Sequence, residues 1–133
     1  MRRDVIKAVA VVFIASFCTM VIELVAGRIM APYVGVSLYT WTSIIGVVLA
    51  GISIGAYLGG ILADRHPTPK TLGWLLFVSG AAALSISPLT GAVAGWRFEA
   101  SLMLRILALT AVIFFVPSCL LGMISPVVVR LSL

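Results

Sequence analysis

The chain has 133 residues, of which 62% are hydrophobic and only 10% are charged, and its mean hydropathy is +1.26. A soluble domain is about 45–50% apolar and about 25% charged, so this chain has too little polar material to cover a globule in water. The same numbers exclude a disordered chain, and two cysteines are too few for a disulfide-stapled secreted module. The composition predicts an integral membrane protein.

Charged residues divide the chain into long uncharged segments. A bilayer core of about 30 Å needs about 20 predominantly apolar residues in a helix, since irregular backbone cannot face lipid. The sequence therefore predicts four transmembrane helices, at Val5–Gly27, Trp41–Ala63, Thr71–Ala94 and Ser101–Ser125. A β-barrel does not fit, because the uncharged runs show no alternation of polar and apolar residues and are much longer than about ten residues.

Short connections separate the predicted helices. Residues 28–40, which include Pro32, have the composition of a loop, and residues 95–100 form a tight link. Residues 64–70, DRHPTPK, hold two prolines that should end one helix and begin the next. Because short links make consecutive helices antiparallel neighbours, we expect an all-α, four-transmembrane-helix bundle in which residues 1–133 form a single membrane domain.

The basic residues near the predicted helix ends indicate the orientation. Six lie on one side: Arg2, Arg3, Lys7, Arg65, Lys70 and Arg130. Three lie on the other: Arg28, Arg97 and Arg105. The excess predicts that both termini are cytoplasmic. Trp41, Trp74 and Trp96 all fall at predicted helix ends, where amphipathic rings prefer the headgroup region.

Glu23 and Arg105 are charged residues that lie inside predicted helices. Each lies about five positions, roughly 7 Å, from the outer end of its helix. Acidic residues at such depth are rare and usually face the interior of a bundle. The matched depth and opposite sign predict that Glu23 and Arg105 approach each other. Three interpretations remain open: a structural pair or a snorkelling Arg105, a site where Glu23 binds a cation or proton and Arg105 tunes it, and contact with lipid headgroups.

Small residues and prolines mark the faces and bends of the predicted helices. Gly51, Gly55 and Gly59 recur every four residues, so they share one face, on which another helix can approach to backbone distance. This spacing predicts close packing within the bundle or at a homodimer seam, and a surface that slides during transport is the alternative. Pro88 and Pro117 each remove a helical hydrogen bond, which fits either a functional hinge or a passive kink.

No residues have the spacing of a catalytic or metal site. His66 is the only histidine and lies in a basic turn without a second ligand, and Cys18 and Cys119 are expected to be free thiols. There is no Ser–His–acid set, no phosphate-binding loop and no Cys/His cluster. We therefore expect no enzyme activity, no cofactor and no metal. The net charge of +5 suits the cytoplasmic membrane surface and anionic lipid rather than nucleic acid.

Two stretches carry a family resemblance. The first reads ELVAGRIMAPYVG at residues 23–35 and continues through Trp41 to GVVLAGISIGAYLGGILADR at residues 46–65. The second reads LLGMISPVVVRL at residues 120–131. Together they resemble the membrane region of the bacterial spermidine synthase-like proteins, which are also described as fused major facilitator/spermidine synthase proteins.

The resemblance implies a multi-pass protein of the bacterial inner membrane with a link to polyamines or similar cations. The predicted orientation places Arg28, Pro32, Tyr33 and Trp41 at an outer-side loop. The resemblance also makes Gly60, Asp64 and Arg65 similar to the cytoplasmic loop signature of the major facilitator superfamily, in which the aspartate and basic residues help to latch the inner gate. Family members usually add further membrane helices and a soluble aminopropyltransferase-like domain. This chain stops at Leu133, so we expect no spermidine synthase activity in it.

Two functions fit these expectations. The first is a transporter or transport half-unit for a small cationic, polyamine-like solute, with the negative charge supplied by Glu23 and aromatic faces by residues such as Tyr33 and Trp41. Because four helices enclose little room, a homodimer or a partner membrane subunit is expected. The alternative is a non-catalytic accessory subunit or membrane anchor of a larger membrane complex.

Overall fold

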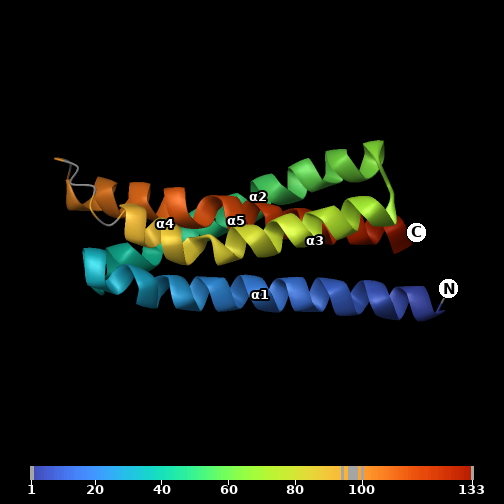
Figure 1. The fold of residues 1–133 in the computed structure, drawn as a ribbon, viewed down its shortest axis with the longest axis horizontal. Coiled ribbons are helices and arrows are strands. Elements are labelled where there is room, and N and C mark those ends of the chain that lie inside the picture. The colour runs from blue at the N-terminus through green and yellow to red at the C-terminus, as the bar shows by residue number, and fades with distance from the viewer. Residues whose placement is uncertain (1, 94, 96–98, 100, 133) are drawn as a thin grey trace.

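The computed structural model describes residues 2–93, 95, 99 and 101–132, which are almost entirely helical and contain no strand. The helices are α1 (Arg2–Val34), α2 (Leu38–Arg65), α3 (Pro69–Leu84), α4 (Ile86–Val93) and α5 (Leu102–Ser132), and they run back and forth along one long axis (Figure 1). Four passages are long and apolar enough to cross a membrane: Arg3–Val34, Leu38–Arg65, Pro69–Val93 and Leu102–Ser132. The prediction of an all-α chain with four helices of membrane-spanning length is confirmed.

The first helix is longer than predicted. It continues through Pro32 to Val34, so the prediction of a loop over residues 28–40 is wrong for most of its length. Proline holds φ near the helical value and removes one backbone hydrogen bond, a loss that long membrane helices tolerate. The helix ends before Gly35, whose φ of 79° is left-handed and suits glycine. Ser37 then caps α2 by accepting a backbone hydrogen bond.

The third passage is a broken helix. Ser85 separates α3 from α4, and the break lies three residues before Pro88. Because Pro88 has no N–H, it cannot donate a hydrogen bond to the carbonyl of Leu84, four residues earlier. At the start of the passage, Thr68 caps α3 and Pro69 occupies the first turn, where a missing N–H costs nothing.

The last helix also exceeds its expected length. It runs to Ser132 rather than ending at Ser125, and both Pro117 and Pro126 lie inside it. The expectations for Ala94, Trp96 and Arg97 fall outside the described residues. The N-terminal end of α1 and the C-terminal end of α5 lie at one end of the bundle, here called the termini end. The Gly35 turn lies at the opposite end, here called the Gly35 end (Figure 1).

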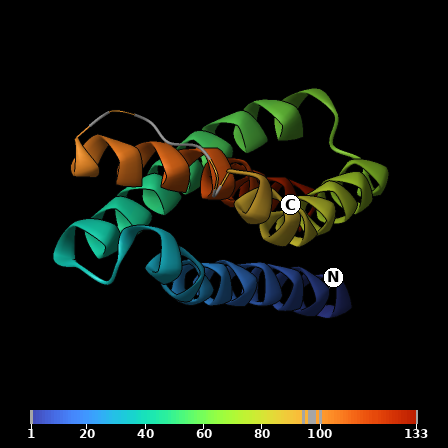
Figure 2. The same ribbon diagram turned by 60° about the vertical axis from the view of Figure 1, so that its left-hand side comes forward.

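α5 is the central helix and packs against all the others, most extensively against α2. In the most apolar 18-residue segment of α5, half of the residues are buried, whereas only 6% are buried in the corresponding segment of α1. From the Gly35 turn, α1 and α2 diverge toward the termini end (Figure 2). Helices α1, α2 and α5 therefore form a wedge that opens toward the termini end, with α5 at its base (Figure 2).

Two apolar clusters hold the bundle together, one at each end. The cluster at the Gly35 end surrounds Phe114, which is fully buried, and consists of Ala26, Met30, Ile44, Val48, Ile86, Val93, Leu109, Ile113 and Phe114. The cluster at the termini end consists of Ala15, Ala63, Leu75, Ile124, Val127 and Val128. Both draw residues from α1, α2 and α5, so each cluster joins all three helices.

Candidate functional site

Between the two clusters, α2 and α5 meet at a glycine seam, which consists of Gly51, Gly55 and Gly59 of α2 and Gly122 of α5. A Cβ atom added to Gly55 would overlap the backbone carbonyl of Cys119. One added to Gly59 would lie 2.6 Å from the carbonyl oxygen of Met123. The helix that approaches the glycine face is thus α5 of the same chain, and the two backbones are too close for any larger residue.

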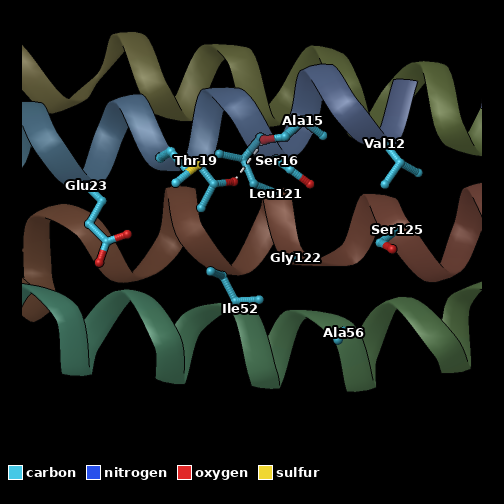
Figure 3. A pocket seen from close by; sticks show the side chains of 11 residues that line it. Val12, Ala15, Ser16, Thr19, Glu23, Ile52, Ala56, Leu121, Gly122 and Ser125 are labelled. Atoms are coloured by element: carbon cyan, nitrogen blue, oxygen red, sulfur yellow. Dashed lines mark hydrogen bonds between the residues drawn. The ribbon is translucent and has the colours of Figure 1, made fainter. Parts of the chain in front are cut away.

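Beside this seam, a groove of about 370 Å³ opens between α1 and α2, with α5 as its floor, and Gly122 of the seam is among its lining residues (Figure 3). We call it the Glu23 groove. Its polar lining residues are Ser16, Thr19 and Glu23 of α1 and Ser125 of α5. Its apolar lining residues include Val12, Ile52, Ala56 and Leu121. The site is therefore a mainly apolar cleft that holds one carboxylate and three hydroxyls.

Glu23 extends from α1 across the groove toward α5 (Figure 3). Its side chain is half-buried, and within the described part of the chain it makes no salt bridge and no side-chain hydrogen bond. Thr19 lies one turn away on the same face and donates its hydroxyl proton to the carbonyl of Ala15 at 2.9 Å. The oxygen of Thr19 remains able to accept hydrogen bonds. Glu23 and Thr19 therefore present acceptors to the groove.

The predicted pair between Glu23 and Arg105 is not formed. Arg105 lies three residues after the start of α5, whereas α1 continues eleven residues beyond Glu23, which is about 16 Å of helix. The matched depth inferred from the sequence depended on an early end for α1, and the longer helix removes it. On α5, the groove is lined from Leu121 onward, and Leu121 lies sixteen residues, or about 24 Å, beyond Arg105.

Arg105 has its own unusual surroundings at the Gly35 end. Its side chain is half-buried, and its Nε atom is fully buried without a hydrogen-bond partner in the described structure. The other predicted outer-side residues lie near the Gly35 turn. The ring of Trp41 covers Gly27, with a ring carbon 2.7 Å from where a Cβ would stand, and joins α1 to α2. Arg28, Pro32 and Tyr33 are exposed.

At the termini end, Asp64 and Arg130 form a salt bridge of 3.7 Å between the ends of α2 and α5. Both side chains are more than half exposed, so this pair is a weak contact. Arg65 is also exposed, and Gly60 faces open space. Sequence reasoning used Arg130 only as an orientation marker. Its contact with Asp64 depends on α5 running past Pro126, which the sequence did not predict.

Sequence reasoning also missed the hydroxyl groups of the groove. Ser16, Thr19 and Glu23 are spaced by three and four residues, so they share a face of any helix that contains them. That spacing was a usable signal. The contribution of Ser125 was not predictable, because it depends on which face of α5 turns toward α1.

Nothing in the described ranges adds a metal or thiol site. Among these residues, no group of three or more His, Cys, Asp or Glu side chains could hold a metal ion. Cys18 is exposed, Cys119 is half-buried, and both are free. Comparisons with protein-family models, curated proteins and solved structures give no match for the chain. The geometry of the Glu23 groove is therefore the basis for a functional interpretation.

Proposed function

We propose that the chain is a multi-pass membrane protein that binds a small cationic solute at Glu23 and carries it across the bilayer, as a transporter or transport half-unit. The observation that supports this most directly is the carboxylate of Glu23, which faces a groove between membrane-length helices without a partner among the described residues. We further propose that both termini face the cytoplasm of a bacterial inner membrane, in line with the distribution of Lys and Arg.

The physical argument starts from the energy of a charge in a poorly solvated site. A carboxylate within a bilayer has a large desolvation cost unless it is protonated or paired. A bound cation offsets that cost and makes hydrogen bonds to the carboxylate and to Thr19. The unpaired Glu23 thus favours cations over anions or neutral solutes, and the resemblance to the spermidine synthase-like membrane region agrees with a cationic solute.

Transport also needs a part of the protein that can move. The glycine seam joins α2 and α5 at backbone distance, so these helices form the more rigid unit. α1 is far less buried and carries Glu23 on its inner face. A shift of α1 against the α2–α5 unit would open or close the groove without breaking the seam, and we propose this as the transport movement.

The test is uptake and binding of labelled cations by the full chain in proteoliposomes. Replacement of Glu23 by Gln should reduce cation binding and uptake at least tenfold. Glu99→Gln is the matched control, because Glu99 is exposed in the connection between α4 and α5 and does not line the groove. If Glu23→Gln leaves the binding and uptake of every tested cation unchanged, the proposed function is wrong.

A second candidate is an accessory subunit or anchor of a larger membrane complex. The observation that favours it is that α1 and the third passage are mostly exposed. Only 6% and 17% of the residues in their most apolar 18-residue segments are buried. Faces of this kind can contact a partner helix as well as lipid. Purification in mild detergent from native membranes separates the two functions. A second protein in fixed stoichiometry supports a subunit, whereas a homodimer or lone chain supports a transporter.

A further inference from the structure

The charge of the Glu23 groove limits the ligand it can take. Glu23 is the one charged side chain among the described lining residues. Asp64 and Glu99 lie elsewhere, since Asp64 pairs with Arg130 at the termini end and Glu99 lies between α4 and α5. A polyamine would place its further ammonium groups beside apolar walls without a partner, which carries a large desolvation cost. One carboxylate suits a ligand with one positive charge.

The hydrogen-bond acceptors of the groove favour a primary ammonium group. Glu23 and Thr19 lie one helical turn apart, and both face the groove. A primary ammonium has three N–H donors, so it can bond to the carboxylate and to the hydroxyl oxygen of Thr19 together. A quaternary ammonium has no N–H and is held by charge alone. Discrimination between these two cations is therefore a specific expectation of this arrangement.

The rest of the groove suits an apolar body. From Glu23 toward the termini end, the walls are formed mainly by Val12, Ile52, Ala56 and Leu121 (Figure 3). Eleven residues of α1 separate Glu23 from Val12, which corresponds to about 16 Å of groove. The lining has hydroxyls at Ser16 and Ser125 but no second charge, so an alkyl or aryl chain fits there without loss of ion pairs.

The direction of the groove matches the way an amphiphile lies in a bilayer. Glu23 is on the Gly35 side, and the apolar part of the groove leads from it toward the middle of the molecule and the termini end (Figure 3). An amphiphile in the leaflet at the Gly35 end has its headgroup at the surface and its chain toward the bilayer centre. It can therefore enter between α1 and α2 from the side without turning over, but its ammonium group must move deeper into the bilayer, because about 16 Å of helix separates Glu23 from the end of α1.

We propose that the ligand of the Glu23 groove is an amphiphilic primary amine, with one ammonium group on an apolar body, taken up laterally from the membrane. This inference rests on the proposed function, because it specifies which cation Glu23 binds. An aminophospholipid shares the ammonium group but adds a phosphate beside it. No Lys or Arg is present among the described lining residues to pair with that phosphate, and Glu23 would repel it. The free amine is thus the occupant.

The probe is tritiated dodecylamine, added to the full chain in phosphatidylcholine nanodiscs, with concentrations expressed per lipid. Saturable binding that depends on Glu23 distinguishes occupation of the groove from simple partition of the amine into lipid. Glu99→Gln is the control and should bind dodecylamine as the unchanged chain does. We expect binding to Glu23→Gln to be at least tenfold weaker. Unlabelled dodecyltrimethylammonium, butylamine and spermidine should each compete at least tenfold less well than dodecylamine.

Thr19 provides an independent test of the hydrogen-bond argument. Thr19→Val should weaken dodecylamine binding about tenfold or more, because a lost hydrogen bond to a charged group is worth about 1.5 kcal/mol or more. It should leave dodecyltrimethylammonium binding unchanged. Thr42→Val is the control, since Thr42 is exposed on α2 and lies outside the groove lining. Equal losses for both ligands would contradict the role of Thr19.

Each remaining outcome distinguishes this inference from the proposed function. If spermidine competes as well as dodecylamine, or better, the amphiphile is the wrong ligand class while a cation site at Glu23 stands. If phosphatidylethanolamine in the nanodiscs abolishes dodecylamine binding, an aminolipid occupies the groove and the free amine is wrong. If no cation of the panel binds in a Glu23-dependent way, the proposed function itself falls. Glu23→Asp, which keeps the charge, should keep the same ligand order and thereby excludes misfolding as the cause.

Discussion

Helix α5 packs against α2 and against α1 at very different distances. Toward α2, glycines let the two backbones come so close that a single added carbon would collide with the facing main chain. Toward α1, the contact leaves a groove of about 370 Å³ in the middle of the bundle. In a bilayer, apolar side chains gain little by leaving lipid for one another, so helices associate through close packing. The α2–α5 contact has glycines on both helices and packs closely, whereas α1 contributes no glycine to the lining of the groove.

The difference shows why the unpaired acid is on α1. A carboxylate would not fit into the glycine seam, where no space remains, and it would need an internal partner there. In the groove, Glu23 has room for a partner from outside the chain. The molecule therefore combines a tightly packed pair of helices with one loosely packed wall, and the candidate site is at that wall.

The largest expected effect is at the glycine seam. Gly55→Leu places a side chain against the backbone of Cys119, which cannot move aside as a flexible side chain can. Overpacking typically costs about 1–3 kcal/mol and more where backbone must shift, so we expect loss of the folded state. Gly46→Leu is the control, since a Cβ at Gly46 meets open space. Size-exclusion chromatography and helical circular dichroism in detergent measure both variants. Equal behaviour would mean that the seam is not close-packed.

The next effect concerns the cluster at the Gly35 end. Phe114 is fully buried there, whereas Phe17 on α1 is 60% exposed. Phe114→Ala should reduce the free energy of unfolding by about 3 kcal/mol, because it leaves a cavity among packed side chains. Phe17→Ala should cost less than about 1 kcal/mol, since lipid fills the space. Reversible unfolding in mixed micelles gives both values. A larger loss for Phe17 would show that α1 packs against a partner in that medium.

A smaller effect distinguishes an unpaired Glu23 from a structural pair. Because Glu23 has no salt bridge to Arg105 and its charge is poorly solvated, Glu23→Gln should leave the free energy of unfolding unchanged or raise it. A buried ion pair that loses one partner costs about 3–5 kcal/mol instead. The effects of Glu23→Gln and Arg105→Gln should also add in the double variant. Coupling between the two would restore the pair that the sequence predicts.

The sequence was sufficient for the architecture because lipid imposes a simple requirement. Uncharged runs of sufficient length must be helices, and the four passages follow from that alone. The helix ends were less predictable. Pro32 is expected in a loop, and the fourth helix is expected to end at Ser125, just before Pro126, yet both prolines lie within helices. The actual end of α1 is before Gly35, where a left-handed φ is needed.

The errors about the site follow from those helix ends. The depths of Glu23 and Arg105 matched only while α1 was expected to end at Gly27. The glycine spacing in α2 indicated a close helix contact, but nothing in the sequence specified α5 as the neighbour. The Ser16 and Thr19 spacing was readable and was missed. Contacts between helices distant in sequence, such as Ser125 with the α1 wall, depend on helix rotation, which hydropathy does not determine.

A weak, salt-dependent effect is expected at the end of the seam, where Asp64 and Arg130 connect α2 to α5. Their side chains are 74% and 54% exposed, so water and salt screen the pair. Asp64→Asn should cost at most about 1 kcal/mol at low ionic strength, and less in high salt. Arg65→Gln is the control, because Arg65 is an exposed neighbour outside this pair. Unfolding at two salt concentrations tests this. A loss of several kcal/mol would mean that the α2–α5 contact depends on charge at its end, whereas a small, salt-sensitive loss leaves the glycines as its main source of stability.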